Sequence, residues 1–356
     1  MISPRAEDSL VRGFDGIVCD LDGVVYRSHN AVPHAVESLS AALSAGVLVV
    51  YATNNASRPP AEVSAHLDAL GLAGPVSRVV TSAQAGARHL AQHCSPGSRV
   101  LAVGGPGVTL ALEEAGLCPV LASAAQSGPP VQAVLQGYGA LVAWTDLAEA
   151  AYAVQAGATW VVSNIDSTLP TDRGVAPGNG ALVGAVRAAV SVDPVVVGKP
   201  HTPLYDLSVS ILGTSIERTL AIGDRLDTDI VGASAAGIDS LFVFGGVHGW
   251  GDVASADLAA RPRYVATDLR ALHSTYEEPS QDPLDLSRWV CGQAKAWVSA
   301  SGDLNVSPGG ELNERLRAAL TALWEANDVR GCQLDPRSGD GAALSDALER
   351  AFSAGR

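Results

Sequence analysis

The sequence predicts an α/β protein in which strands of parallel sheets alternate with helices. From residue 14 to about 270, short β-rich runs alternate with stretches whose apolar residues recur at helical spacing. There are more strand candidates than one small sheet needs, so we expect two sheets, one inserted in the other. Polar residues follow several strands directly, and open α/β sheets place their sites at such positions.

The strand candidates are apolar runs bounded by turn residues or by helical patterns. In chain order they are Gly16–Asp20, Val47–Thr53, Arg78–Thr81, Arg99–Val103, Val131–Gln136, Trp160–Asn164, Val195–Gly198, Thr219–Gly223, Leu241–Phe244 and Arg263–Ala266. The helix candidates between them are Pro33–Ala45, Pro59–Leu70, Ser82–Cys94, Leu147–Ala156, Gly180–Val190, Pro203–Leu212 and Thr228–Ala236. This rhythm is typical of strands joined by helical crossovers.

The pattern changes after about residue 272. The stretch from Glu277 to Pro283 is polar and contains two prolines, which predicts a linker over residues 272–285. Beyond it we expect a strand at Trp289–Ala300, a second strand at Leu304–Ser307 and a last helix at Ala342–Phe352. Between them, leucines recur at helical spacing from residue 312 to 323. We therefore expect residues 286–356 to form a small α+β module, too short to hold a large core alone.

Composition narrows the classes of function. The chain has 356 residues and a net charge of −14, so we expect neither a nucleic acid nor a membrane surface as partner, because both are polyanions. Its five cysteines are an odd number at wide spacings, which fits a reducing cytoplasm better than a disulfide framework. The first residues lack the apolar segment of a signal peptide, and no apolar run approaches membrane-spanning length.

The stretch Asp20-Leu21-Asp22-Gly23-Val24 carries the strongest chemical signal. It follows a buried strand, and Gly23 permits a sharp turn directly after the two carboxylates. If both carboxylates overlook one crevice, a cation or a shared proton must offset their repulsion. Asp-Gly pairs are also common in solvated turns, so this stretch alone does not decide a function.

Further polar segments follow three other predicted strands. They are Thr53-Asn54-Asn55-Ala56-Ser57, Gly198-Lys199-Pro200 and Gly223-Asp224-Arg225-Leu226-Asp227-Thr228-Asp229. Together with the first segment they offer a carboxylate nucleophile, a second carboxylate for proton transfer, groups that hold phosphate, a cation, and carboxylates for Mg²⁺. This combination indicates phosphoryl transfer through a covalent aspartyl intermediate.

These segments, in this order, resemble the nucleophile and three later motifs of the haloacid dehalogenase superfamily of phosphohydrolases. The resemblance covers residues 14–270 and implies a Rossmann-like parallel-sheet core at 14–81 plus 191–271, with an inserted α/β cap at 82–190. The phrase from Thr168 to Gly174, followed by Pro177-Gly178-Asn179-Gly180, looks like the cap of subfamily IIA. With the C-terminal module, the layout is similar to actinobacterial glycerol 3-phosphate phosphatases.

The resemblance also implies roles for single residues. Asp20 would attack phosphorus, and Asp22 would protonate the leaving alkoxide and then deprotonate water. Mg²⁺ would be held by the Asp20 carboxylate, the Asp22 carbonyl and Asp224, with Asp229 supporting its water shell. Asp227 stays open between that role and the first turn of a helix, where the dipole favours acidic residues.

The same resemblance implies that residues of the second and third motifs bind the phosphate group of the substrate. Thr53, Asn54 and Asn55 belong to the second motif, in which a hydroxyl and a backbone N–H would bind phosphate oxygens. Lys199 would neutralise charge on the transferred group. In the cap, Asp166 and Thr168 could hydrogen-bond the hydroxyls of a polyol, although a simple turn explains them equally well. The expected substrate is therefore a small phosphorylated metabolite, with glycerol 3-phosphate first.

Other functions stay open from the sequence. Within the same chemistry, the substrate could be a sugar phosphate, phosphoglycolate or pyridoxal phosphate. A non-catalytic module that binds a phosphometabolite would use the same pocket.

A dinucleotide site at Gly104-Gly105-Pro106-Gly107 has the wrong glycine spacing, so we expect a tight turn there. His89 and His93 lack the glutamate of a zinc-protease helix and are expected at the surface. Homodimerisation is open.

Overall fold

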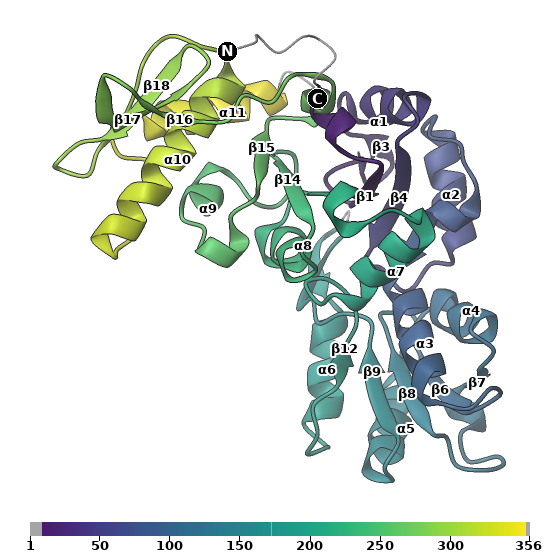
Figure 1. Cartoon of the computed structure of the whole chain (residues 1–356). Helices are drawn as coiled ribbons and strands as arrows, with labels where there is room; N and C mark the ends of the chain where they lie inside the picture. Colours follow the sequence, from purple (N-terminus) through teal and green to yellow (C-terminus); the bar gives the residue numbers. More distant parts are fainter. Residues whose placement is uncertain (1–8, 172, 354–356) are drawn as a thin grey trace. The chain divides into compact units, whose positions relative to one another are not determined.

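The computed structural model describes residues 9–171 and 173–353, which fall into two compact units (Figure 1). The first unit combines the chain up to Val49 with the chain from Thr214 onwards, and the second is the continuous segment Val50–Gly213. Both contain parallel strands and helices, which confirms the predicted α/β class. The predicted core, cap, linker and module boundaries stay predictions. Within the described residues, no helix is both long and apolar enough to cross a membrane.

Parallel strands form the centre of the first unit. Neighbouring strands follow the order β15 (Tyr264–Ala266), β14 (Asp239–Val243), β13 (Thr219–Gly223) and β1 (Gly16–Cys19). β1 and β13 are buried along their whole length, as expected for strands of a parallel sheet that is covered on both faces. Because they are parallel, their carboxyl ends lie at one edge, where Asp20 and Asp224 follow.

The first unit also contains a hairpin, short helices and single helical turns. They are the hairpin β2 (Tyr26–Arg27) and β3 (Asn30–Ala31), helices α1 (Ala35–Ser44), α8 (Val231–Ala235) and α9 (Trp250–Ala254), and single turns at Leu10–Gly13, Ile216–Arg218, Leu258–Ala260 and Leu269–His273. The single helix predicted at Thr228–Ala236 is divided into two helical segments of different type. A π-helical turn, Leu226–Ile230, precedes α8, and such turns are frequent at functional sites.

The C-terminal part of the first unit is an antiparallel sheet with two helices. Its elements are β16 (Ser280–Asp282), β17 (Asp285–Cys291), β18 (Ala294–Val298), β19 (Leu304–Val306), α10 (Leu312–Arg330) and α11 (Gly341–Ser353). The single strand predicted at Trp289–Ala300 was wrong, because Gly292 adopts φ +54° and turns the chain into a hairpin. Part of the predicted linker also pairs as β16.

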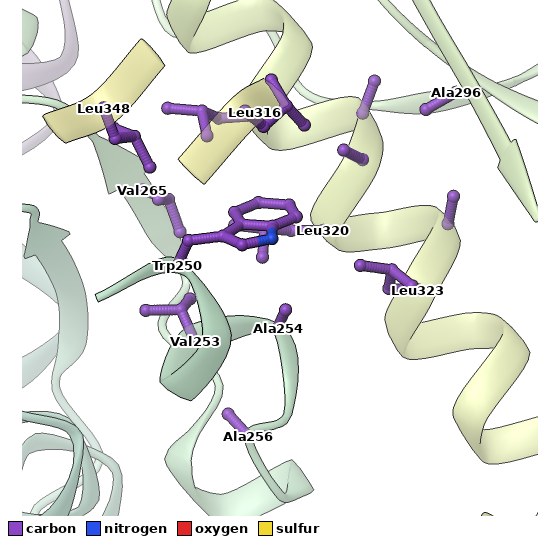
Figure 2. Packing of buried hydrophobic residues seen from close by; sticks show 14 of the residues in the cluster. Trp250, Val253, Ala254, Ala256, Val265, Ala296, Leu316, Leu320, Leu323 and Leu348 are labelled. Carbon is purple, nitrogen blue, oxygen red and sulfur yellow. The ribbon is translucent and has the colours of Figure 1, made fainter. Parts of the chain in front are cut away.

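One hydrophobic cluster joins this C-terminal part to the parallel strands (Figure 2). Trp250, from α9, is 3% exposed and lies among Leu316, Leu320 and Leu348 of the C-terminal helices. Its indole N–H donates to the carbonyl of Pro336 at 2.8 Å. The C-terminal segment therefore packs against the core, which was one of the roles left open by the sequence.

The second unit contains a five-stranded parallel sheet. Its order is β12 (Val195–Val196), β9 (Thr159–Val162), β8 (Ala133–Gln136), β6 (Arg99–Val103) and β7 (Cys118–Val120). The strand β4 (Leu48–Thr53) runs into this unit and pairs in parallel with β5 (Val79–Thr81). Neither β7 nor the hairpin of β10 (Thr168–Thr171) and β11 (Gly174–Pro177) was expected from the sequence.

Helices of the second unit pack in pairs beside its strands (Figure 1). They are α2 (Pro60–Ala69), α3 (Ser82–His93), α4 (Pro106–Glu114), α5 (Trp144–Gln155), α6 (Asn179–Arg187) and α7 (Pro203–Leu212), with single turns at Val76–Arg78 and Ala122–Ala124. The helix α3 contacts α4, and α5 contacts α6. The tight turn expected at Gly104 is confirmed between β6 and α4, where a Cβ on Gly105 would lie 2.5 Å from the Ser57 carbonyl oxygen.

Candidate active site

Asp20 and Asp22 lie directly after β1, at the edge of the first unit's parallel strands. The Asp20 N–H donates to the Ile222 carbonyl at 2.9 Å, which continues the pairing of β1 with β13 by one residue. The chain then turns, with Gly23 at φ +90°, a conformation that favours glycine. Asp20 is half-buried and Asp22 is exposed.

Asp224 follows β13 and is completely buried. One carboxylate oxygen, Oδ2, accepts a hydrogen bond from the Val247 N–H at 2.8 Å. Two glycines leave room for this carboxylate. A Cβ on Gly23 would lie 2.6 Å from Oδ2, and a Cβ on Gly246 would lie 1.5 Å from it. The position of Asp224 therefore depends on two backbone segments without side chains.

Asp229 returns to the same edge through the π-helical turn. It is 3% exposed, and its Oδ2 accepts from the Arg225 N–H at 3.1 Å. Gly223 is again necessary, because its Cβ would lie 2.2 Å from the Cβ of Asp229. The spacing of five residues between Asp224 and Asp229 is therefore closed by a loop and a wide turn.

Asp227, the doubtful residue of this motif, has a different partner. Its carboxylate accepts two hydrogen bonds from the Arg225 side chain, at 3.1 and 2.8 Å. Burial acts to raise the pKa of Asp227, but the hydrogen bonds and charge of Arg225, with the charge of His248, outweigh it and lower the pKa. Asp227 is thus held as a carboxylate in an ion pair at the surface.

Three of the predicted metal residues meet in the first unit. Asp20, Asp224 and Asp229 each offer one carboxylate oxygen, and these oxygens all lie within 4.8 Å of one another. Carboxylates this close repel one another unless a cation or protons intervene. Their hard oxygen donors suit Mg²⁺, which usually needs few protein ligands and keeps several waters. The Asp22 carboxylate is exposed and is not part of this cluster, and the role of its backbone carbonyl as a ligand stays a prediction.

In the second unit, the second motif begins at the carboxyl end of β4. Thr53 is 3% exposed, and its hydroxyl accepts from the Asn55 N–H at 3.1 Å. The Asn55 side chain then accepts from the Ser57 N–H at 2.9 Å. These local bonds hold the segment as a compact turn directly after the strand.

Asn54 links the second motif to Lys199. Its side-chain amide donates to the Lys199 carbonyl at 3.0 Å, and its Oδ1 accepts from the Lys199 N–H at 2.8 Å. The same amide donates to Asp166 Oδ2 at 3.3 Å. Lys199 itself is 4% exposed. The structure therefore brings together Asn54, Lys199 and Asp166, which were predicted from segments far apart in sequence, whereas Thr168 lies exposed at the start of β10.

Two supporting residues were not found from the sequence. The Asn164 side chain donates to the Asn54 carbonyl at 2.8 Å, and Ser82 donates to the same carbonyl at 2.6 Å. Gly246 is a third omission, and the pair Gly245-Gly246, which follows β14 after one residue, was a signal that could have pointed to it.

Comparisons with known proteins agree with this arrangement. The family model described as "Haloacid dehalogenase-like hydrolase" matches residues 17–118. A second model, for proteins like the haloacid dehalogenase (HAD) hydrolases, matches residues 196–272. A D-glycerol 3-phosphate phosphatase of Mycobacterium tuberculosis is 40% identical over 348 residues, which are 96% of this chain and 95% of the relative. The 5′-nucleotidase YutF of Bacillus subtilis is 32% identical over 237 residues, which are 67% of this chain and 90% of that protein.

The fold of this chain is also similar to solved structures of phosphatases. A glycerol phosphate phosphatase of Mycobacterium tuberculosis in complex with calcium has a TM-score of 0.79 and 37% identity, and the match covers 98% of this chain and 99% of the other. Its complex with magnesium has a TM-score of 0.77 and 38% identity, covering 89% and 92%. The carboxylate cluster, the ordered motifs and these matches lead to one conclusion: this chain belongs to the family of haloacid dehalogenase-like hydrolases.

Proposed function

We propose that this protein is a Mg²⁺-dependent phosphomonoester hydrolase with glycerol 3-phosphate as its preferred substrate. The observation that carries the proposal is the cluster of Asp20, Asp224 and Asp229 at the ends of β1 and β13. The choice of substrate is supported by the relative named D-glycerol 3-phosphate phosphatase, which this chain matches over 95% of that protein's length. Homodimerisation and a cytoplasmic location stay predictions.

The reaction proceeds in two steps, in which Asp20 is the nucleophile and Asp22 transfers protons. In the first, a carboxylate oxygen of Asp20 attacks phosphorus and the bond from phosphorus to the substrate oxygen breaks. Asp22 gives its proton to that oxygen, so glycerol leaves as a neutral alcohol. In the second, Asp22 takes a proton from water, the hydroxide attacks phosphorus, and the acyl–phosphate bond breaks to release phosphate and the free Asp20 carboxylate.

The remaining predicted residues bind and orient the phosphate. Thr53 and Asn54 offer a hydroxyl and a backbone N–H to its oxygens, and the Lys199 ammonium offsets its charge. The hydrogen bonds between Asn54 and the Lys199 backbone support this role, because they fix the main chain from which the lysine extends. Asp166 and Thr168 are proposed to contact the hydroxyls of the leaving group.

Mg²⁺ would be held by Asp20, Asp224 and the Asp22 carbonyl, with Asp229 near its water shell, and would offset negative charge on the phosphate. The donor set in the structure fits this ion, because two of its carboxylates are buried and all three face one another. Asp229 keeps its carboxylate oriented through the Arg225 N–H.

A nucleoside 5′-monophosphate is the second candidate substrate, because the 5′-nucleotidase relative covers most of its own length in this match. The two substrates differ in the size of the leaving group and share the chemistry at phosphorus. Relative values of kcat/KM for glycerol 3-phosphate, nucleoside monophosphates, sugar phosphates, phosphoglycolate and pyridoxal phosphate therefore separate the candidates.

The test is the release of inorganic phosphate from these monoesters with Mg²⁺ and with EDTA. We expect Mg²⁺-dependent release, highest kcat/KM for glycerol 3-phosphate, and loss of activity in Asp20→Asn. Asp227→Asn is the matched control, since its carboxylate pairs with Arg225, and it should keep most of the activity. If Asp20→Asn were as active as the native chain, the covalent mechanism would be wrong. If no phosphate appeared at all, the binding-module function would replace it.

A further inference from the structure

A cavity in the first unit includes none of the residues of the carboxylate cluster in its wall. It has a volume of about 680 Å³, within the usual range for sites that bind small molecules. Its walls come from α8, the start of β14 and the segment before β15 on one side, and from β17 and α10 on the other. It therefore lies where the parallel strands meet the C-terminal segment.

Arg317, on α10, is the most informative residue of this cavity. It lines the cavity although it is only 7% exposed. Its Nε donates to the Val265 carbonyl at 3.1 Å, and the guanidinium lies 3.7 Å from the centre of the Tyr276 ring. Among the residues that the structure describes, no carboxylate forms an ion pair with it. A buried guanidinium without an anion is costly, because little solvent remains to compensate its charge.

The other two arginines of the cavity differ in this respect. Arg261 forms two hydrogen bonds with Asp328, at 2.6 and 2.7 Å, and Arg263 pairs with Glu278. Their positive charges are therefore offset within the protein. Beside Arg317, burial raises the pKa of the Cys291 thiol to about 11, so this neighbour is neutral at physiological pH. Among the described arginines of this cavity, Arg317 is thus the one without a paired carboxylate, although the carboxylates of Asp239 and Glu278 also belong to the wall.

Aromatic rings form other parts of the wall. Trp324 donates its indole N–H to the Val253 carbonyl at 2.9 Å, and Trp289 donates to Glu325 at 2.7 Å. These bonds hold the edges of the rings. Both residues line the cavity together with Tyr276. Rings held in this way can pack against a flat ligand with little loss of conformational freedom.

We propose that this cavity binds a small organic anion in which one phosphate or carboxylate group is attached to a flat ring. Arg317 binds the anionic group, and the aromatic side chains contact the ring. The site is independent of the hydrolysis proposed above, because it shares no residue with the carboxylate cluster or with the motifs that contact phosphate.

The test is a binding titration of the full chain, without Mg²⁺ and with EDTA, so that no ligand is hydrolysed. AMP, phenyl phosphate, benzoate and indole-3-acetate are the probes, with adenosine and inorganic phosphate as fragments. Calorimetry measures the affinity. We expect at least one ring-bearing anion to bind in a 1:1 complex, and each fragment to bind about tenfold more weakly or worse.

Variants locate the bound probe. Arg317→Met should weaken binding about tenfold or more, whereas Lys199→Met should leave it unchanged. Arg317→Met is first checked for folding by circular dichroism. If it does not fold, Ser234→Trp takes its place, because Ser234 is exposed and lines the cavity from α8, so that a large side chain there should reduce the space for a ligand.

Three results would overturn the proposal. In the first, none of the ring-bearing anions binds the native chain. In the second, binding survives the Arg317 or Ser234 substitution but is lost in Lys199→Met, which assigns the probe to the catalytic phosphate site. In the third, adenosine binds as tightly as AMP, or inorganic phosphate as tightly as every ring-bearing anion, so that one half of the proposed recognition is absent.

Discussion

Gly246→Ala is expected to disable the metal site without changing a single predicted ligand. The new methyl group would lie 1.5 Å from Oδ2 of Asp224 and 2.3 Å from its Cγ. Ordinary contacts of this kind need more than about 3 Å, so the carboxylate or the loop must move by roughly 1.5 Å or more. Asp224 is fully buried and its Oδ2 is held by the Val247 N–H, so it cannot rotate away freely.

The size of the effect follows from the coordination chemistry. Mg²⁺ requires near-octahedral geometry with short bonds to oxygen, so a ligand displaced by more than about 1 Å no longer binds well. We expect the apparent Kd for Mg²⁺ to rise about 10- to 100-fold and kcat/KM to fall about 100-fold at limiting Mg²⁺. Overpacking should also cost about 1–3 kcal/mol of stability, which leaves the protein folded at 25 °C.

The assay is phosphate release from glycerol 3-phosphate as a function of Mg²⁺ concentration at 25 °C, with thermal unfolding measured in parallel. Gly251→Ala is the matched control, because its Cβ would meet no atom closer than 3.9 Å. It should titrate with Mg²⁺ like the native chain. If Gly246→Ala kept the native Mg²⁺ dependence and kcat/KM, then Asp224 would not be the ligand that this cluster requires.

Three further predictions follow from contacts in the two units. Asn54→Ala removes both hydrogen bonds to the Lys199 backbone and should lower kcat/KM about 10- to 100-fold; unchanged steady-state kinetics would contradict this. Leu316→Ala opens a cavity in the cluster of Figure 2 and should cost about 2–5 kcal/mol, seen as a lower urea midpoint; an unaltered midpoint would show that this contact contributes little. Burial raises the pKa of the Cys291 thiol from 9.0 to about 11. At pH 8, iodoacetamide should therefore modify the exposed Cys332 and spare Cys291, which mass spectrometry can show. The free energy of unfolding should also decrease as the pH rises from 9.0 to about 11, because the unfolded thiol loses its proton first.

The core of the candidate site could be predicted because its chemistry is local in sequence. Asp20 and Asp224 directly follow apolar strands, and parallel strands bring their carboxyl ends to one edge. The same logic placed Thr53 at the end of a strand and Lys199 shortly after one. The strand predicted at Trp289–Ala300 failed for a local reason: residues typical of strands lie on both sides of Gly292, and only the backbone conformation of that glycine shows the hairpin.

The sequence by itself determined the α/β class, the order of the motifs and the residue types of the reaction, because these depend on periodicity and on chemistry carried by short segments. Tertiary structure alone decided whether Asp227 joins the acidic residues that converge. Asp229 returns to Asp224 through a π-helical turn, while Asp227, two residues earlier, pairs with Arg225. It also decided that Arg317, a charged residue on a helix, is buried rather than solvated. Such outcomes depend on long-range packing, which fixes the distance between residues that no local pattern relates.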